Sequence, residues 1–201
     1  MSETVAPRRK NHTLALPNIL TYGRVLAVPV VVGLMFWPDE FWMRWTALGV
    51  FTAAGITDFF DGYLARAWKL QSSMGRMLDP IADKLLVAAA LLVLTFVGTI
   101  GAVSLWAALV ILSREILVSG LREFLAEVRV SVPVSRLAKW KTALQMTAIG
   151  FLVAGPAGDA VTGGELVTRI GVAGLWIAAV LTLYTGYDYF RASYRYLMDD
   201  A

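Results

Sequence analysis

Four aspartates lie close together in the stretch DFFDGYLARAWKLQSSMGRMLDPIADK, between two strongly apolar segments. Asp58 and Asp61 are three residues apart, so they share one face of a helix. Asp79 and Asp83 are four residues apart and share a face in the same way. A short turn between the two helices would let the pairs converge, and four carboxylates in one pocket repel each other unless a cation intervenes. Carboxylate oxygens suit Mg²⁺ or Mn²⁺, so the pattern is typical of two divalent ions that serve phosphoryl chemistry.

Small and basic residues around the aspartates favour a phosphate ligand. Gly62 and Gly75 have no side chain, which would let a ligand approach the backbone, and Ala65 extends this uncluttered strip. Arg66 could reach a phosphate, because guanidinium matches phosphate geometry. Two other interpretations of the aspartates stay open: the ion pathway of a transporter, and a network of salt bridges that orients the helices.

The composition indicates an integral membrane protein. Of the 201 residues, 58% are hydrophobic, whereas a soluble globular chain is typically about 45–50% apolar. The absence of cysteine excludes disulfides, thiolate metal sites and a cysteine nucleophile. The one histidine, His12, lies in a polar N-terminal segment, which argues against a histidine-based triad or zinc site. The basic run in that segment is too short to favour nucleic-acid binding.

Six apolar segments are long enough to cross a bilayer, which takes roughly 20 residues. The predicted helices cover 16–37, 41–65, 77–97, 103–125, 137–154 and 168–190, with a turn-rich loop at 155–165. The predicted fold class is therefore an all-α integral membrane protein with six transmembrane helices in one bundle. Residues 1–13 are expected to form an N-terminal tail, and 14–201 the membrane domain.

The basic residues predict how the bundle is oriented. With six spans, both termini and the aspartate stretch lie on the same side of the membrane. Of the eighteen Lys and Arg residues, only Arg44 and Arg169 fall on the other side. Because cytoplasmic loops carry an excess of Lys and Arg, the termini and the aspartates are expected to face the cytoplasm.

The order Asp-x₂-Asp-Gly-x₂-Ala-Arg-x₈-Gly-x₃-Asp-x₃-Asp, from Asp58 to Asp83, resembles the signature of the CDP-alcohol phosphotransferase family at every fixed position. The resemblance implies a six-helix membrane fold, usually homodimeric, with its site on the cytoplasmic side. It also implies a CDP-linked lipid donor, an alcohol acceptor and CMP as the leaving group. The four aspartates would then hold two Mg²⁺ or Mn²⁺ ions, and Asp83 would be the general base.

A donor site is expected around the signature. The CDP-lipid would contact small and basic positions of the signature, and also polar positions that share a face early in the first helix. These residues are Gly62, Ala65, Arg66, Gly75, Asn18 and Thr21. Pro17 suits a helix start, so a local capping role for Asn18 is the alternative.

Three further segments resemble bacterial family members that use glycerol 3-phosphate as the acceptor. They read LPNILTYGRVLAVPVVV, SREILVSGLREFLAE and SRLAKWKTALQM. The implied reaction transfers the phosphatidyl group of CDP-diacylglycerol to glycerol 3-phosphate in a bacterial inner membrane. Phosphatidylglycerol, serine and inositol phosphate are the alternative acceptors.

Basic residues on the fourth and fifth predicted helices fit a phosphorylated acceptor. Arg114, Arg122, Lys139 and Lys141 all fall at the cytoplasmic end. A charge-assisted contact from this cluster would hold the acceptor's phosphate, which a serine or phosphatidylglycerol acceptor would need less. The alternative is that these are ordinary topogenic charges, which Glu115 and Glu123 could neutralise.

Overall fold

The computed structural model describes residues 16–37, 39–68, 73–130 and 136–198, and these form helices joined by short connections, with no strand among them. The helices are α1 (Leu16–Met35), α2 (Phe41–Trp68), α3 (Ser73–Phe96), α4 (Leu105–Glu127), α5 (Arg136–Thr162) and α6 (Leu166–Met198). The prediction of an all-α chain with six helices is confirmed.

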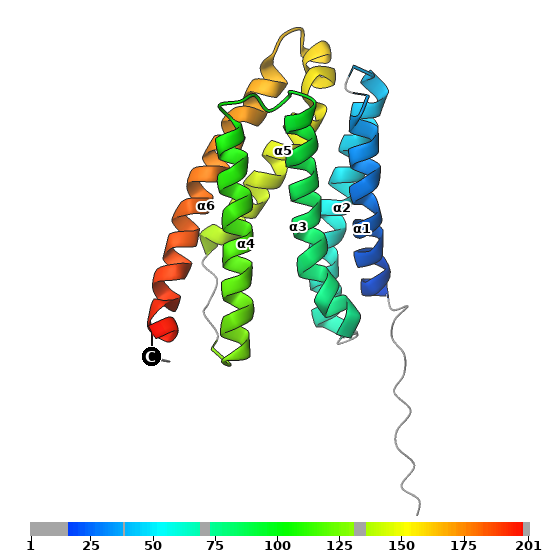
Figure 1. Cartoon of the computed structure of the whole chain (residues 1–201). Helices are drawn as coiled ribbons and strands as arrows, with labels where there is room; N and C mark the ends of the chain where they lie inside the picture. Colours follow the sequence, from blue (N-terminus) through cyan, green and yellow to red (C-terminus); the bar gives the residue numbers. More distant parts are fainter. Residues whose placement is uncertain (1–15, 38, 69–72, 131–135, 199–201) are drawn as a thin grey trace, which may run out of the picture.

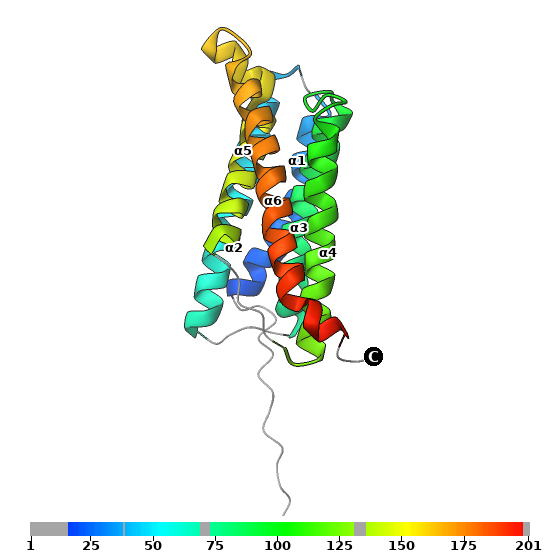
Figure 2. The same cartoon turned by 90° about the vertical axis from the view of Figure 1, so that its left-hand side faces the viewer.

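The helices form a single bundle and run alternately in opposite directions (Figures 1 and 2). The start of α1 and the end of α6 therefore lie at the same end, together with the end of α2 and the start of α3. We call this the aspartate end, because it carries Asp58, Asp61, Asp79 and Asp83. The opposite end carries the α3–α4 and α5–α6 connections. The α5–α6 and α1–α2 pairs pack most extensively, whereas α3 and α4 make few contacts with each other.

Apolar side chains occupy both the core and the outer surface of the bundle. Phe51, Leu94 and Ile111 are buried between the helices. Leu26 and Leu117 are among many large apolar side chains that point outward. Helices that are apolar all round favour lipid rather than water as the surrounding solvent.

Within the described ranges, three stretches are long and apolar enough to cross a membrane: Asn18–Met35, Trp140–Thr162 and Leu166–Tyr194. They belong to α1, α5 and α6. Polar and charged residues make the other helices less apolar. In α2, for example, these residues include Arg44 and Asp58. Helices α1, α5 and α6 are therefore candidate spans, and the prediction that all six helices cross the membrane stays a prediction.

The predicted loop at 155–165 is confirmed at 163–165, which join α5 to α6, but residues 156–162 are helical. Helix α5 kinks sharply at Gly155, where φ is 37° and ψ is −120°, and then continues to Thr162. The positive φ favours glycine, and Pro156 suits the first turn of the helical segment that follows. The Gly-Pro pair therefore divides α5 into two helical segments that run in different directions.

Asp159 sets where α6 begins. Its carboxylate accepts hydrogen bonds from the backbone N–H groups of Val167 at 2.7 Å and Thr168 at 3.1 Å, and from the Thr168 hydroxyl at 2.5 Å. These N–H groups belong to the first turn of α6, where no intrahelical acceptor exists. A side chain of α5 thus caps α6 and fixes the hairpin between them.

Arg44 supports the kink of α5 from the facing helix α2. Its Nη1 donates to the carbonyl oxygens of Leu152 at 3.4 Å and Val153 at 3.3 Å, and its Nη2 donates to Thr99 Oγ1 at 3.0 Å. Pro156 has no N–H to bond the Leu152 carbonyl four residues earlier, so the guanidinium supplies a donor in its place. A Cβ on Gly155 would lie 2.8 Å from Nη1, which leaves no room for a larger residue. Arg44, expected only as a charge at this end, is a structural residue.

Replacing Arg44 with methionine should destabilise the fold. The change leaves buried carbonyls without this donor, at a cost of roughly 1–3 kcal/mol for each. A thermal unfolding curve in detergent should show a clearly lower midpoint. Arg169→Met is the matched control, because Arg169 lies at the same end in an exposed pair with Glu165 at 3.0 Å, and it should change stability by at most about 0.5 kcal/mol. Equal midpoints for both variants would contradict the role of Arg44.

Candidate functional site

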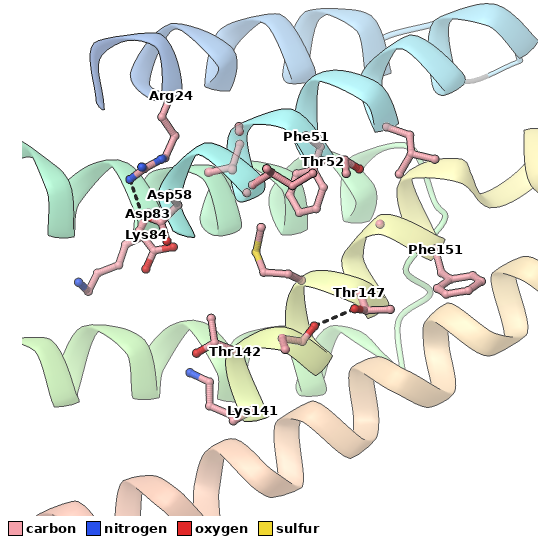
Figure 3. Close-up of a pocket in the computed structure, with 18 of the residues that line it drawn as sticks. Arg24, Phe51, Thr52, Asp58, Asp83, Lys84, Lys141, Thr142, Thr147 and Phe151 are labelled. Carbon is pink, nitrogen blue, oxygen red and sulfur yellow. Dashed lines mark hydrogen bonds and ion pairs between the residues drawn. The ribbon is translucent and has the colours of Figure 1, made fainter. Parts of the chain in front are cut away.

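A cavity of about 1290 Å³ lies mainly between α2 and α5 and combines a charged end with an apolar length. The charged lining lies at the aspartate end and includes Arg24, Asp58, Asp83, Arg114, Arg122 and Lys141. The apolar lining includes Leu48, Phe51, Met146, Phe151, Val161 and Val167. Figure 3 shows Asp58 and Asp83 on one side of this space and Lys141 on the other. The cavity can therefore take a ligand with a strongly anionic head and a long apolar part.

Asp58 is paired with an arginine from α1. Arg24 Nη1 lies 2.7 Å from Asp58 Oδ1, and the Arg24 side chain is fully buried while that of Asp58 is 44% exposed (Figure 3). Asn18 and Thr21 are also buried. The three residues follow one another at intervals of three, so they lie on the same face of α1. The spacing of these three polar residues in an apolar helix was the signal for an inward face, but it did not reveal the partner of Arg24.

The two pairs of aspartates are described to different extents. Asp58 on α2 and Asp83 on α3 both line the cavity, so the structure brings one member of each pair together. The side chains of Asp61 and Asp79 lie outside the described residues. Among the side chains that are described, no group of three or more His, Cys, Asp or Glu residues could hold a metal ion. The four-aspartate metal site therefore stays a prediction.

The structure describes the surroundings of only some of the other signature residues. Gly62, Ala65 and Arg66 belong to α2, but their surroundings and side chains are among the parts that are left undescribed. Gly75 is buried near the start of α3. Their expected contacts with a CDP-lipid stay predictions.

Arg114 and Lys141 meet at Glu115. Lys141 donates a hydrogen bond to Glu115 Oε1, and Arg114 Nη1 lies 3.7 Å from the same oxygen. Arg114 Nη2 also donates to Thr185 Oγ1 on α6 at 3.2 Å. A Cβ on Gly186 would lie 2.9 Å from Arg114 Cγ, so the arginine packs closely on α6. Arg114 therefore joins α4 to α6 as well as lining the cavity.

The other basic residues of the predicted cluster differ in how they are held. Arg122 is exposed, and its guanidinium carbon lies 5.8 Å from the centre of the Tyr189 ring, which is a cation–π distance. The side chain of Lys139 lies outside the described residues. The structure thus brings Arg114, Arg122 and Lys141 to the cavity that holds Asp58 and Asp83. The predicted pairing of Glu115 with neighbouring cations is confirmed by the contact with Lys141.

Comparison with known proteins identifies the class. The family model for CDP-alcohol phosphatidyltransferase matches residues 14–184. This chain belongs to that family, as its signature predicted.

Curated relatives match across nearly the whole chain. The CDP-diacylglycerol–glycerol-3-phosphate 3-phosphatidyltransferase of Rickettsia bellii is 50% identical over 181 residues, which cover 90% of this chain and 96% of the relative. The proteins of the same name from Cereibacter sphaeroides and Shigella flexneri are 41% and 40% identical. Each alignment covers 92% of this chain, with 98% and 97% of the respective relative.

Proposed function

We propose that the chain is a membrane enzyme of phospholipid synthesis that transfers the phosphatidyl group of CDP-diacylglycerol to glycerol 3-phosphate. The products are phosphatidylglycerophosphate and CMP. The observation that carries the proposal is the cavity in which two carboxylates face a basic cluster and continue into a long apolar space. Relatives named for this reaction, which match over nine-tenths of the chain, support it.

The donor fits the two parts of the cavity. The diacylglycerol chains would lie along the apolar length between α2 and α5, where Phe51 and Phe151 are part of the wall. The CDP head would then lie at the aspartate end. Donor contacts are proposed for the residues that the family signature and the first helix supply, namely Gly62, Ala65, Arg66, Gly75, Asn18 and Thr21.

The residues at the aspartate end suit hard divalent cations. Asp58 and Asp83 present carboxylate oxygens to one cavity, and the neighbouring signature aspartates are Asp61 and Asp79. We assign two Mg²⁺ or Mn²⁺ ions to these four residues. When bound, such ions would offset the negative charge of the donor's diphosphate. Arg24 contributes a fixed positive charge beside Asp58 and keeps its carboxylate oriented toward the cavity.

Asp83 is the proposed general base. It would take the proton from the primary hydroxyl of glycerol 3-phosphate as the hydroxyl oxygen attacks the phosphorus attached to diacylglycerol. A new oxygen–phosphorus bond forms, the bond to the CMP oxygen breaks, and CMP leaves. The acceptor's phosphate would be held by Arg114, Arg122, Lys139 and Lys141, which keeps it apart from the carboxylates.

The charge bias supports an orientation with both termini and the aspartate end in the cytoplasm. We propose six membrane spans in a bacterial inner membrane, with residues 1–13 as a cytoplasmic tail, 14–201 as the membrane domain, and a homodimer as the assembly. A reporter fused after Ala201 should give a cytoplasmic signal, and one inserted at Gly163 a periplasmic signal. The reverse result would mean that the spans or the charge bias were misread.

The purified protein should release CMP from CDP-diacylglycerol when glycerol 3-phosphate is the acceptor. Chelation with EDTA should stop the release, and Mg²⁺ or Mn²⁺ should restore it, because oxygen ligands without His or Cys favour hard ions. Phosphatidylglycerol, serine and inositol phosphate serve as comparison acceptors. Faster release with one of these would reject glycerol 3-phosphate as the substrate, and full activity without metal would reject the two-metal site.

Loss of one basic residue of the cluster should weaken acceptor binding specifically. A charge-assisted contact is worth roughly 1.5–3 kcal/mol, so Arg122→Gln or Lys141→Gln should raise KM for glycerol 3-phosphate on the order of ten- to a hundredfold. KM for CDP-diacylglycerol should change much less. Arg191→Gln is the control, because Arg191 is an exposed arginine near the same end that does not line the cavity.

Thermal midpoints must accompany these measurements, because Lys141 is buried and paired with Glu115. If both variants unfold like the wild type and keep its acceptor KM, Arg122 and Lys141 do not hold the acceptor's phosphate.

A further inference from the structure

A second cavity, of about 430 Å³, lies between α3, α4 and α5. It meets the larger cavity at Asp83, Lys84, Glu115, Ser119 and Thr142, which line both spaces. Asp83 can therefore be approached from two sides, one facing α2 and one facing α4. Nothing in the proposed reaction yet uses the second side.

Gln145 supplies the observation that points to a ligand in this second cavity. Its side chain lines the cavity, its residue is only 2% exposed, and its Oε1 has no hydrogen-bond partner among the described residues. A buried acceptor without a donor destabilises a fold. Gln145 also follows Lys141 by four residues on α5, so both side chains project from the same face of that helix. The missing donor is thus expected beside the proposed phosphate-binding lysine.

The second cavity has a largely apolar wall, and most of the polar groups in it accept hydrogen bonds. Asp83, Glu115 and Glu123 present carboxylates. Ser119 and Thr142 add hydroxyls. The one lysine of the lining, Lys84, donates its Nζ to the Pro80 carbonyl at 2.8 Å. Three carboxylates against one lysine favour a neutral part of a ligand over its anionic part: hydroxyl groups would find acceptors here, and carbon atoms would contact the apolar wall.

We propose that the second cavity receives the glycerol part of the acceptor and that Gln145 Oε1 accepts a hydrogen bond from its secondary hydroxyl. The assignment rests on the proposed function and deepens it. The acceptor's phosphate stays with Lys141, about 6 Å away along the helix, since four residues rise by that distance. The primary hydroxyl then lies beside Asp83, where the two cavities meet. Gln145 is in this way a specificity-determining residue for a polyol phosphate.

The test compares glycerol 3-phosphate with 3-hydroxypropyl phosphate, which lacks only the secondary hydroxyl. Wild-type protein should show a KM for the analogue that is higher on the order of tenfold. Gln145→Met keeps the length of the side chain but removes the acceptor. This variant should raise KM for glycerol 3-phosphate by a similar factor, lose the discrimination between the two acceptors, and keep KM for CDP-diacylglycerol.

Thr182→Val is the matched control. Thr182 Oγ1 is also buried without a hydrogen-bond partner among the described residues, but it lies in α6 and lines neither cavity. This variant should keep the acceptor preference of the wild type. The thermal midpoint of Gln145→Met should stay at or above the wild-type value, because no internal hydrogen bond is lost.

The outcomes separate this assignment from the proposed function. If the wild type uses glycerol 3-phosphate but accepts the analogue equally well, the assignment of the secondary hydroxyl is wrong, and this result does not depend on any variant. A folded Gln145→Met protein that still discriminates also overturns it. A wild-type protein that releases no CMP with glycerol 3-phosphate overturns the proposed function, and the assignment with it.

Discussion

A carboxylate that lies among apolar helices needs a cation beside it, because an unpaired buried charge is costly and water is largely excluded. In this bundle the cations come from other helices. Arg24 of α1 reaches Asp58 of α2, and Lys141 of α5 reaches Glu115 of α4. The need to pair charges therefore fixes contacts that apolar packing alone would leave free to slide. The four residues of these two pairs also line the charged end of the cavity.

The two ends of the bundle use buried arginines differently. At the aspartate end, Arg24 faces a carboxylate that is partly open to the cavity. At the opposite end, Arg44 bonds backbone carbonyls at the kink of α5, is buried, and does not line the cavity. An arginine thus serves a candidate reaction site at one end and a helix kink at the other. The two arginines differ in their partners: Arg24 pairs with a carboxylate that a ligand could also contact, whereas Arg44 bonds backbone carbonyls that have a structural role.

The sequence predicted the helices and the family but not the contacts between helices. Apolar segments of about 20 residues and the regular spacing of the aspartates are local signals, so six helices and the signature could be read directly. Residues 155–162 were misread as loop because Gly and Pro mark turns in most contexts, and the donor from Arg44 that supports a kink comes from α2. Arg24 and Gln145 were ordinary polar residues in the sequence. Their significance depends on which helix faces them, which no local pattern encodes.

The meeting of the two cavities at Asp83 is what an exchange between a lipid and a small water-soluble alcohol requires. The donor needs an apolar space that continues along the helices, and the space between α2 and α5 has that lining. The acceptor needs hydrogen-bonding groups, and the space between α3, α4 and α5 supplies Ser119, Thr142 and Gln145 within a largely apolar wall. Because α3 and α4 make few contacts with each other, a second space beside α3 can exist without breaking the apolar packing of α1, α2 and α3. Asp83 then lies where the two cavities join, which is where the proposed reaction needs the two substrates to meet.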